Sequence, residues 1–275
     1  MSAALRWQRD LDSWAIPPEI LQAAPESPWG FPVPVFARRA DEAIGRHTPS
    51  NLRAGERLPE HGHILDVGCG GGAASLPLAP RARTITGVDS SRALLDSFRK
   101  RAESLGLVAT TIEGRWPDIS DASPVADVVV CHHVAYNVSD IAPFLHALTA
   151  HARVRVVLEL TAVHPLSVLS PLWLRFHGLV RPTSPTADDA VAVLRELGMN
   201  PAREDWDVSP QGHAVDTGVD ADLVALTRRR LCLPADRDED IASALAEQAT
   251  AQGGSFRMPP RQLVTLWWDG RAVPD

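Results

Sequence analysis

The stretch Ile64-Leu-Asp-Val-Gly-Cys-Gly-Gly-Gly72 decides the fold of this chain. Its apolar start, residues 64–67, predicts a short buried strand, and four of the next five residues are glycine. Each glycine loses much conformational freedom on folding, so such a cluster is costly in a turn that has only a structural role. Glycine also allows sharp bends and lets a ligand lie against bare backbone N–H groups. The segment therefore predicts a ligand-binding loop at the end of a buried strand.

The pattern around this segment predicts an α/β fold. Apolar, β-branched runs alternate with helical patterns from Gly62 onwards, as in parallel βαβ units. Three consecutive valines at 128–130 indicate a strand that is buried on both faces. The expected strands are 63–67, 83–88, 108–112, 126–131, 154–160, 202–208 and 262–268. The expected helices are 73–79, which Pro77 and Pro80 cut short, 92–105, 139–150, 186–197 and 240–250.

The glycine-rich segment resembles motif I of the class I S-adenosylmethionine-dependent methyltransferases. In that motif an acidic residue inside an apolar run precedes Gly-x-Gly-x-Gly, and Asp66, Gly68, Gly70 and Gly72 occupy those positions. The resemblance covers residues 61–160 well and 186–208 loosely. It implies a Rossmann-like sheet of seven mostly parallel strands with helices on both faces, in which the last two strands form an antiparallel hairpin.

A dinucleotide-binding loop is the alternative interpretation of the same glycines. Gly68, Gly70 and Ala73 satisfy the G-x-G-x-x-G/A pattern, and Asp89 follows at a suitable distance for a ribose. Asp66 argues against it, because a carboxylate suits the ammonium group of a methionine moiety and gains nothing near a pyrophosphate. An NAD(P)-dependent oxidoreductase and a non-catalytic protein that binds S-adenosylmethionine or S-adenosylhomocysteine both remain open.

The resemblance assigns cofactor contacts to the ends of the first four strands. Asp89 is expected to hold both ribose hydroxyls through charge-assisted hydrogen bonds, each worth roughly 1.5–3 kcal/mol. It can also cap the helix that follows. Arg115 occupies the place of an aspartate that contacts adenine in many members, and arginine has no acceptor. Trp116 is therefore expected to flank the adenine, or else to anchor its loop. The implied cofactor-binding residues are Asp66, Gly68, Cys69, Gly70, Gly72, Asp89, Ser90, Arg115, Trp116 and His132.

The segment Cys131-His-His-Val-Ala-Tyr-Asn137 corresponds to motif IV of the family, which faces the methyl acceptor. The resemblance makes His133, Tyr136 and Asn137 the catalytic candidates. A histidine here can act as a general base or can simply pack. Neighbouring strand residues point to opposite faces, so the histidine pair is unsuited to one metal ion and no metal is expected.

Composition narrows the class of protein. The net charge of −7 argues against a general nucleic-acid binder, because phosphates would be repelled overall. Three widely spaced cysteines without a C-x-x-C pair fit a reducing, cytoplasmic location. No apolar run reaches the length that a bilayer requires, so no membrane association is expected. The sequence does not indicate an oligomeric state.

The ends of the chain carry the expectations about the acceptor. We divide the chain into a proline- and tryptophan-rich cap segment, residues 1–60, and a methyltransferase domain, residues 61–275, with an insertion at about 209–258. The cap and the loop 165–181 are expected to enclose a small-molecule acceptor. If that acceptor is acidic, Arg175 or Arg181 would recognise it. The alternative is that their aromatic residues form a small separate core.

The resemblance implies a simple reaction. The sulfonium of S-adenosylmethionine already activates the methyl group, so the protein mainly aligns the acceptor, which can lower the barrier by roughly 7–11 kcal/mol. A base is needed only for an acceptor that must lose its proton early. The product is S-adenosylhomocysteine.

Overall fold

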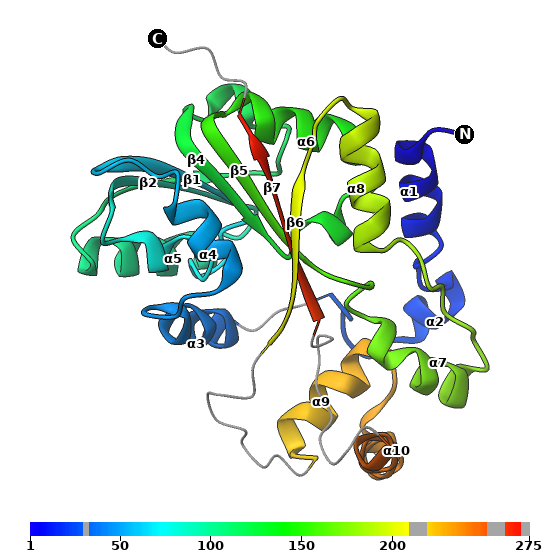
Figure 1. Ribbon diagram of the computed structural model, residues 1–275. Coiled ribbons are helices and arrows are strands. Elements are labelled where there is room, and N and C mark those ends of the chain that lie inside the picture. The colour runs from blue at the N-terminus through cyan, green and yellow to red at the C-terminus, as the bar shows by residue number, and fades with distance from the viewer. Residues whose placement is uncertain (30–32, 209–218, 252–261, 271–275) are drawn as a thin grey trace.

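A computed structural model describes residues 1–29, 33–208, 219–251 and 262–270 (Figure 1). Its seven-stranded sheet has the order β3-β2-β1-β4-β5-β7-β6. β1 to β5 are parallel, and β7 runs antiparallel to both β5 and β6. This topology confirms the predicted fold class. The strands are β1 Gly62–Val67, β2 Ala82–Asp89, β3 Val108–Glu113, β4 Ala126–His132, β5 Ala152–Thr161, β6 Ala202–Asp207 and β7 Gln262–Asp269.

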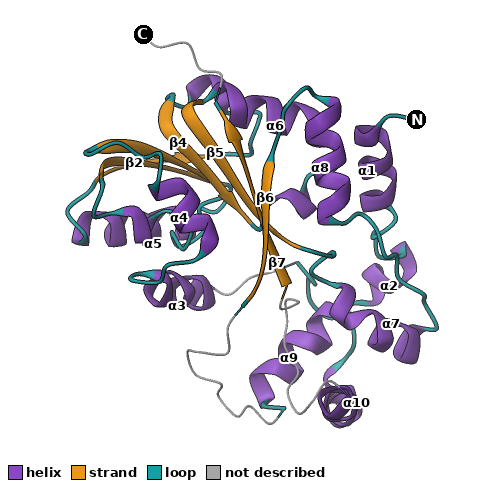
Figure 2. Cartoon of the chain, viewed as in Figure 1, coloured by secondary structure: helices purple, strands orange, loops and turns teal. Residues whose placement is uncertain are grey.

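Helices cover both faces of the sheet and one of its edges (Figures 1 and 2). One face carries α1 (Ala3–Asp12), α6 (Ile141–Ala150) and α8 (Ala187–Glu196). The other carries α3 (Val33–Ala43), α4 (Pro49–Gly55) and α5 (Arg92–Ser104). Beyond the carboxyl ends of the parallel strands lie α2 (Pro18–Ala23), α7 (Ser170–His177), α9 (Ala221–Arg230) and α10 (Asp238–Ala251).

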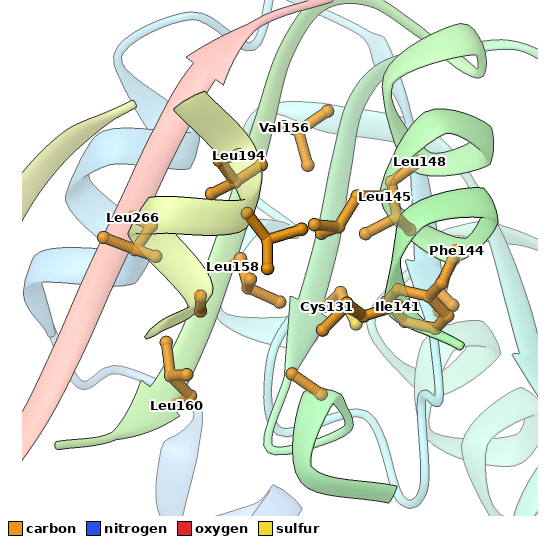
Figure 3. Close-up of a cluster of buried hydrophobic side chains, with 14 of the residues drawn as sticks. Cys131, Ile141, Phe144, Leu145, Leu148, Val156, Leu158, Leu160, Leu194 and Leu266 are labelled. Atoms are coloured by element: carbon orange, nitrogen blue, oxygen red, sulfur yellow. The ribbon is translucent and has the colours of Figure 1, made fainter. Parts of the chain in front are cut away.

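Alternation along the central strands builds a core on each side of the sheet. In β4, Val129 and Cys131 face the α6 side, whereas Val128 and Val130 face the α5 side. The first cluster includes the apolar face of α6, as Figure 3 shows. Burial of each such aliphatic side chain contributes about 1.5–3 kcal/mol. The central strands are therefore fixed in register, and their carboxyl ends are held at one common edge.

The first helix of the expected cap segment shares this core. Trp7 is fully buried in the first cluster, and its Nε1 donates a hydrogen bond to the carbonyl oxygen of Val138 at 2.9 Å. Its ring stacks on Tyr136 with centroids 5.5 Å apart, and α1 packs against α6 and α8. Residues 3–12 therefore help to hold the segment that follows β4.

Two expectations about helices have different outcomes. The helix expected at 73–79 is wrong: the structure has only a short 3-10 turn, Leu76–Leu78, in which Pro77 has no N–H to donate. The helix expected at 240–250 is confirmed as α10, within the proposed insertion. α9 and α10 pack with α7 in a third apolar cluster. The parts of that insertion at 209–218 and 252–258 lie outside the described residues.

Candidate active site

The glycine loop joins β1 to the 3-10 turn and has a backbone that side chains would not tolerate. Gly68 and Gly72 have φ angles of 71° and 101°. A Cβ atom at Gly68 would overlap the side chain of Val134, and one at Gly72 would overlap that of Leu76. The N–H groups of Gly68 and Cys69 both donate to the Val88 carbonyl oxygen, at 2.8 and 3.0 Å. The loop is thus tied to the end of β2.

Helix α3 covers this loop. A Cβ at Gly71 would lie 2.6 Å from the carbonyl oxygen of Phe36, and the atom nearest to a Cβ at Gly70 is in the Phe36 ring. The Cys69 side chain points the other way, into the second apolar cluster, and burial raises the pKa of its thiol. Cys69 therefore contributes backbone, and not its thiol, to the loop that α3 encloses.

Asp66 places a buried carboxyl group directly beneath the loop. Its Oδ2 accepts a hydrogen bond from the Ser75 hydroxyl at 2.5 Å, whereas its Oδ1 has no partner among the described residues. Burial raises the pKa of Asp66 to about 7. An unpaired buried oxygen is costly, so the site is suited to a ligand that brings a hydrogen-bond donor or a positive charge.

Asp89 links the loop to the start of α5. One carboxylate oxygen accepts from the N–H of Gly70 and the other from the N–H of Ser91, both at 2.9 Å. Ser91 is the N-cap of α5, and Ser90 is exposed. Each carboxylate oxygen can accept a further hydrogen bond, so the structural links leave capacity for a ribose hydroxyl.

The segment after β3 separates Arg115 from Trp116. Arg115 is exposed, whereas Trp116 is buried in the first apolar cluster. The Trp116 Nε1 donates to the Phe144 carbonyl oxygen at 3.3 Å, and its ring meets His151 edge-on. These contacts give Trp116 an anchoring role. Its contact with adenine remains a prediction.

A cavity of about 140 Å³ opens where β4 and β5 end. A cavity of roughly this size can hold one benzene ring. Its lining combines the two histidines of motif IV with one carboxylate and with residues from the α3–α4 region and the glycine loop. The lining residues are Ala43, Arg46, Thr48, Asn51, Ala73, His132, His133 and Glu159.

His133 and Glu159 are paired inside this cavity. The His133 Nε2 lies 3.0 Å from Glu159 Oε1, and the His133 backbone N–H donates to the Glu159 carbonyl oxygen at 2.8 Å. His133 has a φ of 60°, an uncommon conformation for a residue with a side chain. About half of its side chain, 48%, is exposed. The His133 ring is therefore fixed at Nε2 by Glu159, and the rest of the ring is accessible.

His132 has a different role. Its Nδ1 is 3.8 Å from Glu159 Oε1, and its buried Nε2 has no partner among the described residues. Burial lowers the pKa of His132, which favours the neutral ring. A neutral imidazole has one nitrogen that donates and one that accepts, and the unpaired nitrogen is available to a ligand.

Glu159 is a residue that the sequence analysis did not single out. It is buried, and its Oε2 accepts from the Ser50 hydroxyl at 2.6 Å. Burial alone would raise the pKa of Glu159, but His132, His133 and Ser50 outweigh burial and lower it to about 2. The available signal was an acidic residue in the apolar strand β5, at the same edge of the sheet as Asp66 in β1.

The structure does not bring the three catalytic candidates together. Tyr136 is buried, its hydroxyl donates to the Thr161 carbonyl oxygen at 2.8 Å, and burial raises its pKa. Asn137 is exposed in the following turn. Of the three, the cavity lining includes His133 alone.

The N-terminal segment and the loop after β5 do meet. Trp14 stacks on His164 with centroids 3.8 Å apart, and the Arg181 guanidinium lies over the rings of Trp14 and Trp173. Arg181 is buried and donates to the Trp14 carbonyl oxygen. Arg175 forms an ion pair with a glutamate of α10. Both arginines thus have structural partners. Burial also lowers the pKa of His164, the ring on which Trp14 stacks, to about 3.

Across residues 1–29, 33–208, 219–251 and 262–270, no three His, Cys, Asp or Glu side chains are grouped in a way that suits a metal ion. Within the same ranges, no helix has the length and apolar character needed to span a bilayer.

Comparison with known families matches the region that carries these features. Residues 64–154 match a family model described as a methyltransferase domain. An uncharacterised protein of Haemophilus influenzae is 35% identical over 96 residues, which are 34% of this chain and 35% of that protein. A ubiquinone biosynthesis O-methyltransferase of Actinobacillus pleuropneumoniae is 40% identical over 75 residues, which are 27% and 30% of the two chains. The chain spans about a third of the length of these curated relatives.

Solved structures share the fold over most of the chain. The YcgJ protein of Bacillus subtilis superposes with a TM-score of 0.53 at 17% identity, covering 82% of this chain and 98% of that one. A Geobacter sulfurreducens S-adenosylmethionine-dependent methyltransferase in complex with S-adenosylhomocysteine also gives 0.53, at 18% identity, covering 86% and 98%. The chain therefore shares the fold of these methyltransferases, and residues 64–154 match a methyltransferase domain, as the glycine-rich motif predicted.

Proposed function

We propose that this chain is an S-adenosylmethionine-dependent methyltransferase that acts on a small-molecule acceptor. The observation that carries the proposal is the glycine loop held between Asp66 and Asp89, within the region that matches the methyltransferase domain. Both carboxylates lie at the carboxyl edge of the sheet, where ligands bind in open α/β folds.

The residues present fit the cofactor. Asp66 offers an unpaired buried oxygen that suits the ammonium of the methionine moiety. Asp89 keeps acceptor capacity for the ribose diol while it holds Gly70 and Ser91. The crowded, positive-φ positions of Gly68 and Gly72 keep side chains away from the loop, so a ligand can lie close to its bare backbone.

The dinucleotide alternative fits less well. Dinucleotide-binding folds have the strand order 3-2-1-4-5-6, whereas here the antiparallel β7 lies between β5 and β6. The Asp66 carboxylate would also oppose a pyrophosphate bound at the same loop. The strand order thus disfavours a dinucleotide fold, and the Asp66 carboxylate favours a cofactor that carries a positive charge.

The chain's own contribution to catalysis is mainly positioning. The cofactor supplies an activated methyl group, and the rigid strand ends would align an acceptor atom with it and keep water away. Alignment of this kind can contribute about 7–11 kcal/mol. The three hydrophobic clusters that hold the strand ends and flanking helices make such alignment feasible.

For the acceptor, we propose a small molecule that presents one ring or a group of similar size to the cavity beside His133. The cavity volume and its mixed apolar and polar lining support this class. The ubiquinone biosynthesis O-methyltransferases among the relatives support oxygen as the methylated atom.

A methyl-transfer assay tests the proposal. The full chain is incubated with S-adenosylmethionine carrying a labelled methyl group and a panel of single-ring phenols, anilines and thiophenols, and S-adenosylhomocysteine formation is measured. We expect turnover with at least one panel member, and loss of turnover at subsaturating cofactor for Asp89→Ala. Tight S-adenosylhomocysteine binding without transfer to any member would support the non-catalytic alternative.

A further inference from the structure

We propose that Glu159 positions His133 as the general base for an acceptor hydroxyl. The inference rests on the proposed methyltransferase function and adds to it a positioning residue, a catalytic residue and the chemical class of the acceptor. Glu159 is a buried carboxylate. Aligning an acceptor with an already activated methyl group does not require such a group.

Two contacts fix His133 against Glu159. The side chains meet between Nε2 and Oε1 at 3.0 Å, and the backbone N–H of His133 donates to the Glu159 carbonyl oxygen at 2.8 Å. The second contact holds His133 at its positive φ, a conformation that is unfavourable for a residue with a side chain and persists only when the surroundings enforce it. The ring is thus held in one orientation at the rim of the cavity.

The carboxylate also selects the tautomer of the ring. An ionised carboxylate only accepts hydrogen bonds, so the hydrogen of neutral His133 must reside on Nε2. Nδ1 is then the nitrogen left to take a proton. When it does so, the resulting imidazolium has a negative partner at 3.0 Å. The other charged or titratable groups that line the cavity are His132 and Arg46.

A chain of hydrogen bonds holds Glu159 from behind. The Ser50 hydroxyl lies 2.6 Å from Glu159 Oε2 and 2.7 Å from the Thr265 hydroxyl, and the Trp206 Nε1 donates to Thr265 at 3.0 Å.

The direction of this chain is fixed by its two ends. The indole N–H can only donate and the carboxylate can only accept. Thr265 must therefore donate to Ser50, and Ser50 to Glu159. Each bond polarises the next in the same sense, so residues of β6, β7 and α4 all support the negative charge on Glu159.

The step balances as a proton-coupled methyl transfer. A lone pair of the acceptor hydroxyl oxygen forms the new O–CH₃ bond, and the S–CH₃ bond breaks with its electron pair going to sulfur. The hydroxyl proton goes to His133 Nδ1 and later to water. A hydroxyl benefits most from such a base, because its neutral oxygen is a weak nucleophile that becomes much stronger as the proton leaves, whereas a neutral amine can attack before it loses a proton. We therefore assign a hydroxyl-bearing acceptor.

The first test measures the tautomer of His133 by NMR and needs no acceptor. Long-range ¹H–¹⁵N spectra of the ¹⁵N-histidine-labelled full chain, assigned with His133→Asn, should show His133 with its hydrogen on Nε2. Glu159→Gln and, more weakly, Ser50→Ala should produce a mixture of tautomers, whereas the exposed control changes Glu103→Gln and Ser104→Ala should not. An Nδ1–H tautomer in the parent protein, or no change in Glu159→Gln, would overturn the positioning role.

The second test measures kcat and its dependence on pH. With a methylated phenol as product, His133→Asn should lower kcat by about 10²–10⁴-fold and remove the decline in kcat at low pH. Glu159→Gln should lower kcat about 10–100-fold and move that decline to lower pH, and Ser50→Ala should do so less. Affinity for S-adenosylhomocysteine should change less than threefold in all three.

The outcomes separate the inference from the function it depends on. If the parent protein does not bind S-adenosylhomocysteine, the proposed function is wrong whatever the tautomer. If it binds and methylates an aromatic amine or thiol but no phenol, the hydroxyl assignment is overturned. If phenol methylation in Glu159→Gln keeps the parent rate and pH profile, Glu159 does not position the base. Circular dichroism and the weaker Ser50→Ala change guard against loss of folding as the cause.

Discussion

Replacing Gly68 by alanine should destabilise the protein through two separable effects. The φ of 71° costs an L-residue roughly 1–2 kcal/mol. The new methyl group would also overlap the side chain of Val134, and such overpacking costs roughly 1–3 kcal/mol. The expected loss in the free energy of unfolding is therefore about 2–5 kcal/mol.

Gly106 provides a matched control. Its φ of 81° carries a similar backbone cost, but a Cβ there would have nothing within 4 Å. Gly106→Ala should thus lose only about 1–2 kcal/mol. The difference between the two variants isolates the contact with Val134.

A double-mutant cycle with Val134→Ala tests the cause. Removing the Val134 methyl groups should recover part of the loss in Gly68→Ala, with a coupling of about 0.5–3 kcal/mol. Denaturant unfolding, followed by circular dichroism, measures all four free energies. If Gly68→Ala is no more destabilising than Gly106→Ala, or if Val134→Ala gives no recovery, the close approach of the glycine loop to motif IV is refuted.

The remaining predictions concern the cofactor and the N-terminal helix. Asp89→Ala should weaken S-adenosylhomocysteine binding at least about tenfold by calorimetry, whereas the exposed control Asp121→Ala should leave it unchanged; equal affinities would mean that the ribose is held elsewhere. Because the pKa of Asp66 is raised to about 7, this carboxyl is protonated below that pH in the free protein, and a bound ammonium favours the carboxylate. Affinity should therefore rise by up to about tenfold per unit as pH increases towards 7 and then level off, and Asp66→Asn should flatten the profile; a falling affinity over that range would contradict the role. The same raised pKa means that Asp66 stabilises the free protein at low pH and that this stability is lost as pH rises through 7. Trp7→Ala should cost about 3–5 kcal/mol while Leu5→Ala, exposed on the same helix, should cost less than about 0.5; equal costs in denaturant unfolding would show that α1 does not share the core.

The fold could be predicted from the sequence because local pattern determines most of it. The short apolar runs at 64–65, 128–131 and 156–158 mark strands buried on both faces, and Gly106 marks the end of α5. The helix expected at 73–79 failed for a local reason as well. Pro77 has no N–H for a helical hydrogen bond, and the segment makes only the short 3-10 turn Leu76–Leu78.

The candidate site was only partly predictable. Asp66 and Asp89 follow a motif of fixed spacing, and the structure places both at the glycine loop. The pairing of His133 with Glu159 instead depends on the register of two neighbouring parallel strands, in which His132 lies opposite Glu159. Ser50 comes from a helix that precedes the motif altogether. Spacing along one chain carries no information about these contacts.

The contacts of the N-terminal tryptophans determine which experiment can test this segment as a lid. Trp7 is part of the core, and Trp14 is held by stacking on His164 and by a hydrogen bond from its Nε1 to Ser184. Deleting residues 1–34 would remove core side chains along with any lid. Point substitutions are therefore the sharper experiment.

Calorimetric titration of the full chain with S-adenosylhomocysteine, run beside a titration with NAD, shows which of the two ligands the glycine loop binds. We expect saturable binding of S-adenosylhomocysteine with one site per chain, weakened at least about tenfold by Asp89→Ala, and no saturable binding of NAD over the same concentration range. Binding of NAD in place of S-adenosylhomocysteine, or saturable binding of neither, would contradict this expectation.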